Sequence, residues 1–249
     1  MIKQLMIVDV TRMDHGNCCI AGVCPQEEGT MYRLCSPYIS QEDVRKYGIK
    51  TGSVFEGNFS RKFGLIGPHV EDCDWKLTGR FQDAEPEALY RYFECSAATD
   101  LFDGLGVNEK GTAADALVNR GRSITTIRPQ SASLQIMSPF EPGGKETLKM
   151  NFWVNGKFFR FITVNDFRFY RADGSIDRKV VAEANMMLSA WRNGERELYL
   201  RVGLTRLWKE KYWLQVDGLH FFDMRPTGSE SAQEVTLMDS CGVVMAKVA

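Results

Sequence analysis

The clearest pattern of hydrophobic and polar positions lies in the second half of the chain. Two aromatic-rich alternating runs, residues 149–154 and 157–164, are separated only by Asn155-Gly156. Alternation with a period of two is typical of β-strands. Asn-Gly between two such runs is a strong hairpin signal, because both central residues of a type I′ turn need positive φ. The pattern therefore predicts a β-hairpin at this place.

A helical period follows this hairpin, and the strand period then returns. Residues 178–193 carry hydrophobic side chains at helical spacing and stop before Gly194, a residue typical of a helix C-terminus. Residues 197–205 and 212–222 alternate again, and residues 133–137 form a candidate strand ahead of the hairpin. The predicted order is β-β-β-α-β-β. This is the order of an OB-fold, a small five-stranded β-barrel.

The first third of the chain repeats this order more weakly. Ser40 is followed by acidic residues and then by Gly48, which predicts a short helix with suitable caps at both ends. The predicted strands around this helix lie at residues 5–10, 17–23, 29–35, 53–59 and near 62–66. We therefore predict a mainly β protein with minor α content. It has two tandem OB-like β-barrels, each with a helix between its third and fourth strands.

The segment between the two predicted barrels divides the chain. Residues 86–95 predict a helix, and the glycine-containing residues 103–106 predict a linker, followed by a short helical piece that ends at Val118. We place the boundary near residue 105. Residues 1–105 then form the first OB-like domain with a trailing helix, and residues 106–249 form the second with a C-terminal extension.

The net charge of −1 is the sum of acidic and basic segments of the chain. Residues 1–109 carry 11 Lys and Arg against 17 Asp and Glu, and residues 110–212 carry 18 against 10. Residues 213–249 carry 2 against 5, and in them residues 234–238 and 243–246 predict either an added hairpin or loosely ordered chain. The basic block contains the second predicted barrel, which favours a module that binds a polyanion. Unevenly scattered solvated charges explain the counts equally well.

Composition limits the class of protein. A length of 249 residues allows two domains, and 44% hydrophobic with 25% charged residues is typical of globular proteins. The seven cysteines form no Cys-x-x-Cys pair, which favours reduced thiols in a cytoplasmic protein. No run approaches 18 apolar residues, and the first residues resemble a strand more than a signal peptide. We therefore expect a cytoplasmic protein that does not enter a membrane.

Short strings over most of residues 3–220 resemble one family in their order and spacing. They are Arg12 with Gly16-x-Cys18 and Ile20-Ala-Gly22, Tyr32-Arg-Leu34, Pro68-His-Val-Glu-Asp-x-x-Trp75, Ser123-Ile-x-x-Ile127-Arg-Pro129, Phe152 with Gly156-Lys-x-Phe-x-Phe161, Asn165-Asp-Phe-Arg-Phe169 and Leu200-Arg-Val-Gly-Leu-Thr-Arg206. Together they resemble the dual OB-domain proteins, bacterial proteins with two OB-like barrels in tandem. The resemblance implies nucleic-acid binding and an accessory role in prokaryotic conflict systems such as anti-phage defence.

The second barrel has the residue types for nucleic-acid binding. OB-folds stack bases on aromatic rings while cationic side chains contact phosphates. Strand alternation places Lys157, Phe159 and Phe161 on one face, and Phe158 and Arg160 on the other. Arginine is unfavourable in a small apolar core, so we expect Phe158 and Arg160 to point outward, although Phe158 could belong to the core and the arginines could simply be solvated. The predicted nucleic-acid-binding residues are Lys157, Phe158, Arg160, Arg168, Arg201, Arg206, Lys209 and Lys211.

Other polar residues invite a catalytic or metal-binding interpretation, and for each a structural role is the stronger prediction. Asp166 lies between predicted strands, where an aspartate commonly caps a turn. His69 precedes two carboxylates, but metal sites usually recruit further His or Cys ligands. Cys18 near His15 could suggest a nucleophile with its base, yet buried strand thiols are commoner. The chain lacks the Walker A, Gly-x-Ser-x-Gly and His-Glu-x-x-His strings. We therefore predict no catalytic residue, no metal and no cofactor.

These patterns lead to one expected function and two alternatives. The expected function is non-catalytic binding of nucleic acid, DNA or RNA and most simply single-stranded, by an accessory protein of a prokaryotic defence system. The first alternative is an adaptor that recruits a nuclease or helicase of the same system, which suits the near-zero net charge and the acidic first module. The second is a sensor of a nucleotide or another small molecule, which would bind in a pocket between the modules.

Overall fold

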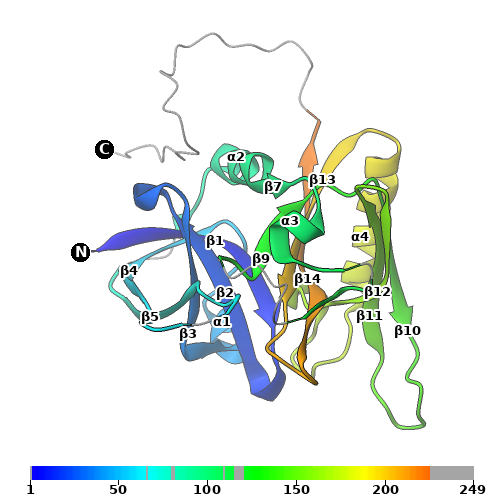
Figure 1. Cartoon of the computed structure of the whole chain (residues 1–249), viewed down its shortest axis with the longest axis horizontal. Coiled ribbons are helices and arrows are strands. Elements are labelled where there is room, and N and C mark those ends of the chain that lie inside the picture. Colours follow the sequence, from blue (N-terminus) through cyan, green and yellow to red (C-terminus); the bar gives the residue numbers. More distant parts are fainter. Residues whose placement is uncertain (1, 66, 80–81, 109, 115–120, 225–249) are drawn as a thin grey trace.

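The computed structural model describes residues 2–65, 67–79, 82–108, 110–114 and 121–224. These residues form two β-sheets that lie side by side, the first from the N-terminal part of the chain and the second from the C-terminal part (Figure 1). The predicted tail hairpin and the end of the predicted helical piece at Val118 lie outside the described residues. In the described part of the chain, no helix is long and apolar enough to cross a membrane.

The first sheet closes into the predicted barrel. Its elements are β1 (Lys3–Arg12), β2 (Asn17–Cys24), β3 (Thr30–Ser40), α1 (Gln41–Lys46), β4 (Ser53–Arg61), β5 (Asp72–Leu77) and β6 (Gln82–Asp83). The strand order is β1-β2-β3-β5-β4-β6, and β1 also pairs with β4, so that five strands form a closed barrel. Helix α1 lies between the third and fourth strands, and the Ser40 side chain caps it by accepting from the backbone of Asp43. The OB-like order is confirmed.

The fifth strand of this barrel lies further along the chain than predicted. We expected it near residues 62–66, but the chain turns there, with positive φ at Gly64, and the strand is β5 at Asp72–Leu77. The apolar residues near position 65 suggested a strand, whereas β5 begins with an aspartate. Asp72 can be buried at that place because Arg33, far away in sequence, forms an ion pair with it at 2.6 Å. Nothing in the local pattern reveals that partner.

The second sheet has the same element order with an interrupted first strand. Its elements are β7 (Ala97–Ala98), α3 (Leu101–Leu105), β8 (Thr112–Ala114), β9 (Ile124–Ile127), β10 (Ser131–Met137), β11 (Thr147–Val154), β12 (Lys157–Val164), the 3-10 turn η3 (Phe167–Phe169), α4 (Arg178–Arg192), β13 (Arg196–Leu204) and β14 (Lys211–Asp223). The strand order is β10-β11-β12-β14-β13-β9-β7. Strands β9 and β10 follow each other directly, and Pro129 between them has no N–H for the ladder. One stretch of chain therefore pairs first with β13 and then with β11.

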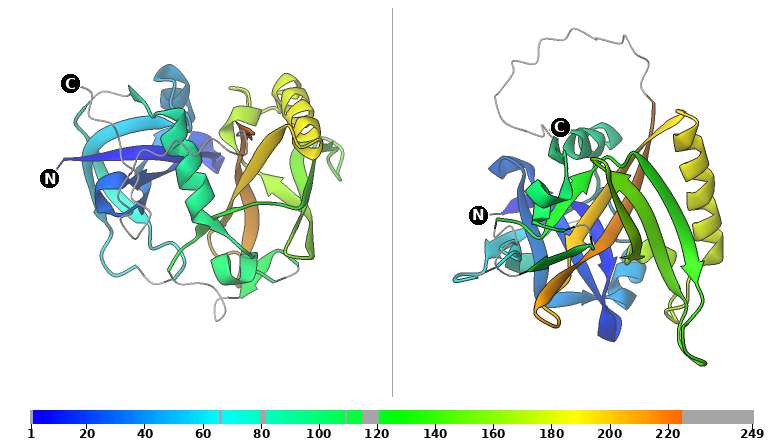
Figure 2. Two further views of the ribbon diagram at one scale, coloured as in Figure 1. Left: turned by 90° about the horizontal axis from the view of Figure 1, so that it is seen from above. Right: turned by 45° about the vertical axis from the view of Figure 1, so that its right-hand side comes forward.

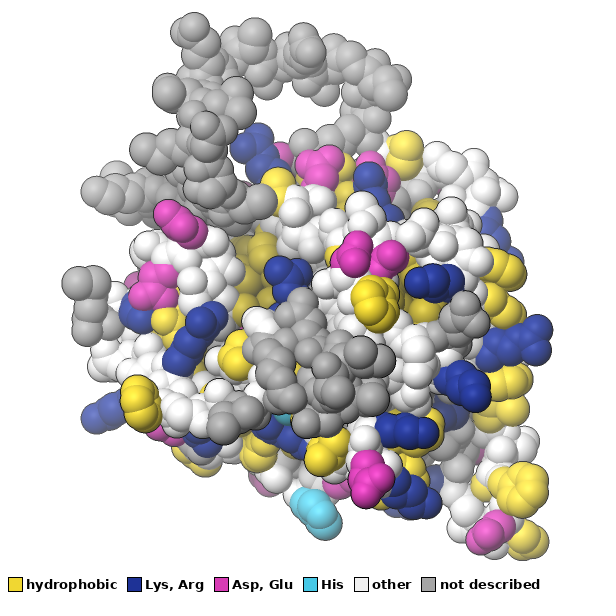
Figure 3. All heavy atoms as spheres, in the orientation of Figure 1, with side chains coloured by type: hydrophobic (Ala, Val, Ile, Leu, Met, Phe, Trp, Pro, Cys, Tyr) yellow, Lys and Arg dark blue, Asp and Glu magenta, His cyan; other side chains and the backbone are white. Residues whose placement is uncertain are grey.

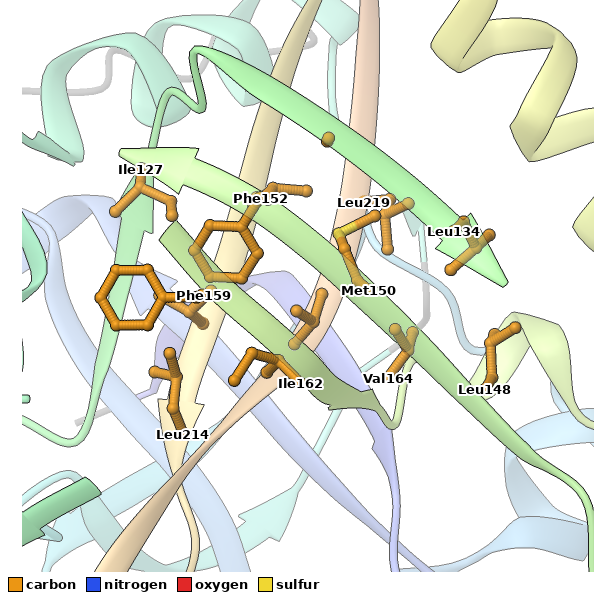
Figure 4. Close-up of a cluster of buried hydrophobic side chains, with 14 of the residues drawn as sticks. Ile127, Leu134, Leu148, Met150, Phe152, Phe159, Ile162, Val164, Leu214 and Leu219 are labelled. Carbon is orange, nitrogen blue, oxygen red and sulfur yellow. The ribbon is translucent and has the colours of Figure 1, made fainter. Parts of the chain in front are cut away.

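The interior of the second barrel is filled by the inward side chains of these strands. Phe152 and Phe159 stack at 5.3 Å between ring centroids, and aliphatic side chains surround them (Figure 4). The predicted hairpin turn is confirmed, with φ of 48° at Asn155 and 72° at Gly156. The predicted helix is α4, which packs against β10 and β13, and Gly194 follows it with φ of 77°.

The segment predicted as a linker is a helix that belongs to the second barrel. Helix α3 (Leu101–Leu105) begins at Asp100, whose side chain accepts from the backbone of Asp103, and Gly106 ends it in the left-handed conformation. Leu101 and Leu105 are buried in the second core. Strand β7, just before this helix, pairs with β9 of the second sheet, so that sheet begins upstream of the predicted boundary near residue 105. The linker prediction for residues 103–106 was wrong, because Asp103 and Gly104 lie inside this helix and Gly106 is its C-terminal cap.

An apolar layer joins the two barrels. Helix α2 (Pro86–Ser96), which confirms the predicted helix over residues 86–95, lies between them in the view from above (Figure 2). The third cluster of buried residues combines Met6, Val8 and Val23 of the first barrel with Phe93 of α2 and Tyr199 of β13. Met6, Val8, Val23 and Tyr199 lie on the outer faces of their strands. Part of the outer wall of the first barrel is therefore an internal surface of the protein.

The segment from Asn165 to Phe169 adds a second contact between the barrels. The backbone N–H of Arg12 donates to the carbonyl of Asn165 at 2.6 Å. Phe167 packs into the core of the first barrel, and the guanidinium of Arg45 lies 4.5 Å from the centre of its ring. Asp166 caps η3 as predicted, accepting from the backbone of Arg168. This string of the sequence thus holds the second barrel on the first.

A buried ion pair crosses the apolar layer. The guanidinium of Arg201 on β13 donates to both carboxylate oxygens of Asp9 on β1, at 2.8 to 3.1 Å. Arg201 also donates to Thr126 Oγ1 at 2.8 Å, and its side chain is only 1% exposed. A bidentate pair with a further acceptor satisfies most of the donors that burial would otherwise leave unpaired.

A further polar group lies at the edge of the same contact. Glu71 accepts from the backbone N–H of Ser123 at 2.6 Å and from its hydroxyl at 3.1 Å. Arg33 donates to Asp72 at 2.6 Å and to Ser123 Oγ at 3.2 Å. Arg206 reaches Asp72 from the second barrel at 2.7 Å. The carboxylates of the string that starts at Pro68 therefore serve the contact between the barrels.

Replacing Arg201 by methionine is expected to lower the free energy of unfolding by about 3–5 kcal/mol, because Asp9 would remain buried without its partner. Chemical denaturation measures the change. The control Arg160→Met removes an exposed arginine and should cost less than about 1 kcal/mol. The double variant Asp9→Leu/Arg201→Met should recover part of the loss. Equal effects of Arg201→Met and Arg160→Met would contradict the role of the ion pair.

The stability of the protein is expected to depend on pH through Asp217. This carboxyl is buried near Asp9, and burial together with that neighbouring charge raises the pKa of Asp217 to about 8 from the ordinary 3.8. The folded protein therefore holds a proton that the unfolded chain releases, and stability declines as pH rises from about 4 to 8.

Asp217→Asn mimics the protonated carboxyl and can still accept from Gln215. Relative to the unmodified protein, its free energy of unfolding should rise by up to about 4 kcal/mol between pH 5 and pH 8, measured by urea denaturation at several pH values. The exposed residue Asp74 supplies the control, Asp74→Asn, for which no such trend is expected. Parallel pH curves for Asp217→Asn and the unmodified protein would exclude Asp217 as the source.

Candidate nucleic-acid interface

The outer face of β11 and β12 carries a stack of aromatic rings. Phe152 and Phe159 are opposite each other and point inward, and the next pair along the hairpin, Trp153 and Phe158, points outward. The rings of this outer pair are nearly parallel, 17° apart, with centroids separated by 4.9 Å. Trp153 is 41% exposed and Phe158 is half-buried. The prediction that Phe158 lies outside the core is confirmed.

Arg160 extends this stack. Its guanidinium carbon lies 5.0 Å from the centre of the Phe158 ring, and the side chain is exposed. The order Trp153, Phe158, Arg160 places a cation at the end of two flat apolar surfaces. A base can stack on such rings while the cation contacts a phosphate.

A β-bulge brings a third ring to the outer face. Asn151 on β11 faces both Arg160 and Phe161, because the register shifts between Met150 and Phe152. The Asn151 side chain accepts from the backbone N–H of Phe161 at 2.8 Å, and Phe161 has a φ of 54°. Phe161 is therefore 52% exposed. The prediction that it shares the face of Phe159 is wrong, because the extra residue interrupts the alternation.

These side chains surround an open depression of about 300 Å³. Its lining residues are Gln135, Asn151, Phe158, Arg160 and Phe161. Basic and hydrophobic side chains alternate along the right-hand edge of the molecule in Figure 3, over the strands β10 to β12 of Figure 1. Flat rings, amides and a guanidinium around a shallow hollow form a surface suited to a planar, anionic ligand.

The remaining predicted residues divide into two groups. Lys157 is half-buried at the start of β12, and Lys209 and Lys211 are exposed at the turn between β13 and β14. Arg168 and Arg206 have carboxylate partners, with Arg168 at 2.5 Å from Asp166 and Arg206 bound to Asp72. Arg168 and Arg206 are therefore held by carboxylates, whereas Lys209 and Lys211 are exposed to solvent.

Arg201 does not belong to this surface. Its place in the ion pair with Asp9 leaves it without the solvent exposure that a phosphate contact requires. Nothing in the alternation of residues 197–205 reveals that the first barrel covers the face on which Arg201 lies. Arg201 therefore belongs to the contact between the barrels.

The sequence analysis missed Trp153, although a signal for it was present. A two-residue Asn-Gly turn fixes the hairpin register, so that Val154 faces Lys157 and Trp153 faces Phe158. Outward placement of Phe158 thus implied outward placement of Trp153. No comparable signal existed for Phe161, since only the bulge turns it outward.

The residues considered for catalysis have structural surroundings. Cys18 is buried in the first core, and burial raises the pKa of its thiol to about 12, which disfavours the nucleophilic thiolate. The ring of His69 contacts the carbonyl of Thr205 at 3.1 Å, and burial next to Arg33 and Arg206 lowers its pKa to about 3. Within the part of the chain that the structure describes, no cluster of His, Cys, Asp or Glu side chains could hold a metal ion.

The closed first barrel, the second sheet with the same element order, and the free aromatic face define a protein of the tandem OB-fold class. A family model described as a dual OB-containing domain matches residues 3–219, and the chain belongs to that family. No curated protein and no solved structure matches this chain. Domains with the OB-fold generally bind nucleic acids or proteins.

Two neighbouring phenylalanines should differ in their effect on stability. Phe159→Ala empties part of the second core and is expected to cost about 3–5 kcal/mol. Phe158→Ala removes only the outer stacking with Trp153 and Arg160 and should cost about 1 kcal/mol. Chemical denaturation of both variants provides the measurement. A Phe158→Ala loss as large as that of Phe159→Ala would mean that the outer stack is part of the core.

Proposed function

We propose that this protein binds single-stranded nucleic acid on the outer face of β11 and β12 and catalyses no reaction there. The observation that carries the proposal is the exposed stack of Trp153, Phe158 and Arg160. It lies on the second and third strands of the second barrel, the face with which OB-folds bind oligonucleotides. The rings accept bases, and the guanidinium contacts the backbone phosphate.

The first barrel supports the choice of the second as the binding module. The equivalent outer face of its β2 and β3 is buried, with Ala21 and Val23 at 0% and Arg33 at 5% exposure. The second barrel and α2 cover it. Each chain therefore offers one face of this kind within its described residues.

The chemistry of this face favours a single strand with little sequence preference. Ring faces can stack only on bases that are free of a double helix, and every base has such a face. The amides of Gln135 and Asn151 line the hollow, and the Asn151 carbonyl oxygen already accepts from Phe161. Stacking and charge therefore supply most of the affinity, which should fall with rising salt as condensed cations are released.

The proposal extends to the biological setting through the dual OB-domain resemblance. Binding without catalysis is the contribution expected of an accessory protein in a prokaryotic defence system. A cytoplasmic location is part of this proposal, and the free thiols of Cys18, Cys19, Cys24, Cys35 and Cys73 support it.

An adaptor function is the second candidate, because exposed Trp with Arg is also typical of protein–protein hot spots. The same rings would then insert into a partner, such as a nuclease or helicase of the same system. Binding experiments with nucleic acid separate the two functions.

Arg160→Glu is expected to weaken binding of single-stranded oligonucleotides at least tenfold, because it places a negative charge where a phosphate would lie. Fluorescence anisotropy across a salt series provides the measurement, and the milder Arg160→Ala should reduce the slope of log K against log salt by about 0.7. The charge-matched control is Lys179→Glu on α4, an exposed residue 84% accessible at its side chain, which should leave binding unchanged.

Unchanged affinity in Arg160→Glu would remove the proposed site. A protein that binds no DNA or RNA in any strand form would point instead to the adaptor function. Stronger binding of double-stranded than of single-stranded oligonucleotides would also contradict the proposal, since paired bases cannot stack on these rings.

A further inference from the structure

The outer face of the second sheet continues beyond β12 towards β14. Strand β12 pairs in parallel with β14 only at Thr163 and Val164. At the start of β14, residues Lys211–Trp213 pair with β8 and not with β12. Gly111, just before β8, accepts from the backbone N–H of Leu214 at 2.9 Å, and a Cβ added to it would lie 3.1 Å from Ile162 Cδ1 of β12. The segment that leads into β8 therefore lies beside both β12 and β14, and β8 itself pairs with the start of β14.

Two further aromatic rings lie at that end of the face. Tyr212 and Leu214 point into the second core, so Trp213 between them points outward, as Phe161 does. The Trp208 ring packs on Trp213 with centroids 5.8 Å apart, and the indole N–H of Trp213 donates to the Trp208 carbonyl at 3.3 Å. Trp208 is 57% exposed.

The turn that carries Trp208 adopts an unusual backbone conformation. Trp208 and Lys211 exchange backbone hydrogen bonds at 2.9 and 3.2 Å, and the two residues between them, Lys209 and Glu210, have φ of 49° and 62°. Such turns favour Asn and Gly because other side chains resist positive φ. Strained conformations persist only where the surroundings enforce them, and they concentrate at ligand-binding sites.

The first barrel supplies part of that enforcement. Arg206, two residues before Trp208, donates to Asp72 at 2.7 Å, and the His69 ring contacts the carbonyl of Thr205. His69 lies just before β5, and Asp72 is its first residue. The base of the turn is therefore fixed by a different barrel from the one that carries it.

Cationic groups accompany these rings. The Lys209 ammonium lies 4.3 Å from the centre of the Trp208 ring, and Lys211 is exposed in the same turn. The turn also carries one carboxylate, that of Glu210, so its two lysines leave it with a net positive charge. The contact of Lys209 with the Trp208 ring resembles that of Arg160 with the Phe158 ring, and Lys211 adds a second cation. This combination suits the bases and phosphates of a single strand.

We infer that Trp208, packed on Trp213, is a second stacking subsite for the strand that binds at Trp153 and Phe158. The inference rests on the proposed function and deepens it. One strand crosses the outer face of β11, β12, β8 and β14, and its bases stack at both ends. In this arrangement the first barrel holds the turn in position through Asp72 and His69.

The length of the bound strand tests this subsite. Oligothymidylates of about 4 and about 16 nucleotides span the range of OB-fold site sizes, and their affinity is measured by fluorescence anisotropy. We expect Trp208→Ala to weaken the longer strand about tenfold and to leave the shorter one unchanged, since the shorter strand occupies Trp153 and Phe158. Trp208→Phe keeps a ring and should restore most of the loss.

Two controls separate the subsite from the rest of the face. Leu207→Ala removes an equally exposed neighbour outside the stack and should change neither affinity. Phe158→Ala should weaken both strands. Thermal unfolding confirms that each variant is folded.

If Phe158→Ala weakens binding while Trp208→Ala does not affect the longer strand, the second subsite is excluded and the proposed function stands. Equal weakening of both lengths by Trp208→Ala also excludes it, because the turn would then belong to the first subsite. If neither variant changes any affinity, the proposed function itself fails.

Discussion

The ion pair of Arg201 with Asp9 joins the two halves of this protein at a buried point of their contact. Each charge is tolerable in an apolar layer only because the other is there, with Thr126 as a further acceptor. The surrounding contacts of Met6, Val8 and Tyr199 exclude water from it. Two barrels that could each form a core of their own are thereby held in one arrangement.

In that arrangement the two barrels differ in which of their outer faces are exposed. Docking covers the outer face of β2 and β3 in the first barrel, whereas the corresponding face of β11 and β12 stays open. The first barrel also holds the turn after β13 through Asp72 and His69. In the proposed function the first barrel therefore contributes position, and the stacked rings and cations of the proposed binding face belong to the second barrel.

Much of the fold follows from local pattern. Period-two alternation, the Asn-Gly turn and the cap after α4 place the strands and helix of the second barrel within a few residues, because each depends on neighbours in the chain. The misplaced elements depend on distant ones. β5 begins with Asp72, which is buried only in the presence of Arg33, and the glycine-containing α3 is a helix whose Leu101 and Leu105 pack into the second core. Phe161 faces outward through a bulge that one extra residue creates.

The sequence alone determined that the protein would form two small barrels, that Phe158 and Arg160 would share an outer face, and that Asp166 would cap a turn. It could not distinguish Arg160 from Arg201, since both are arginines at alternating positions of a strand. The tertiary structure decided between them by covering one face and leaving the other in water. The physical reason is that side-chain alternation is a property of a single strand, whereas burial depends on which surface another part of the chain comes to cover.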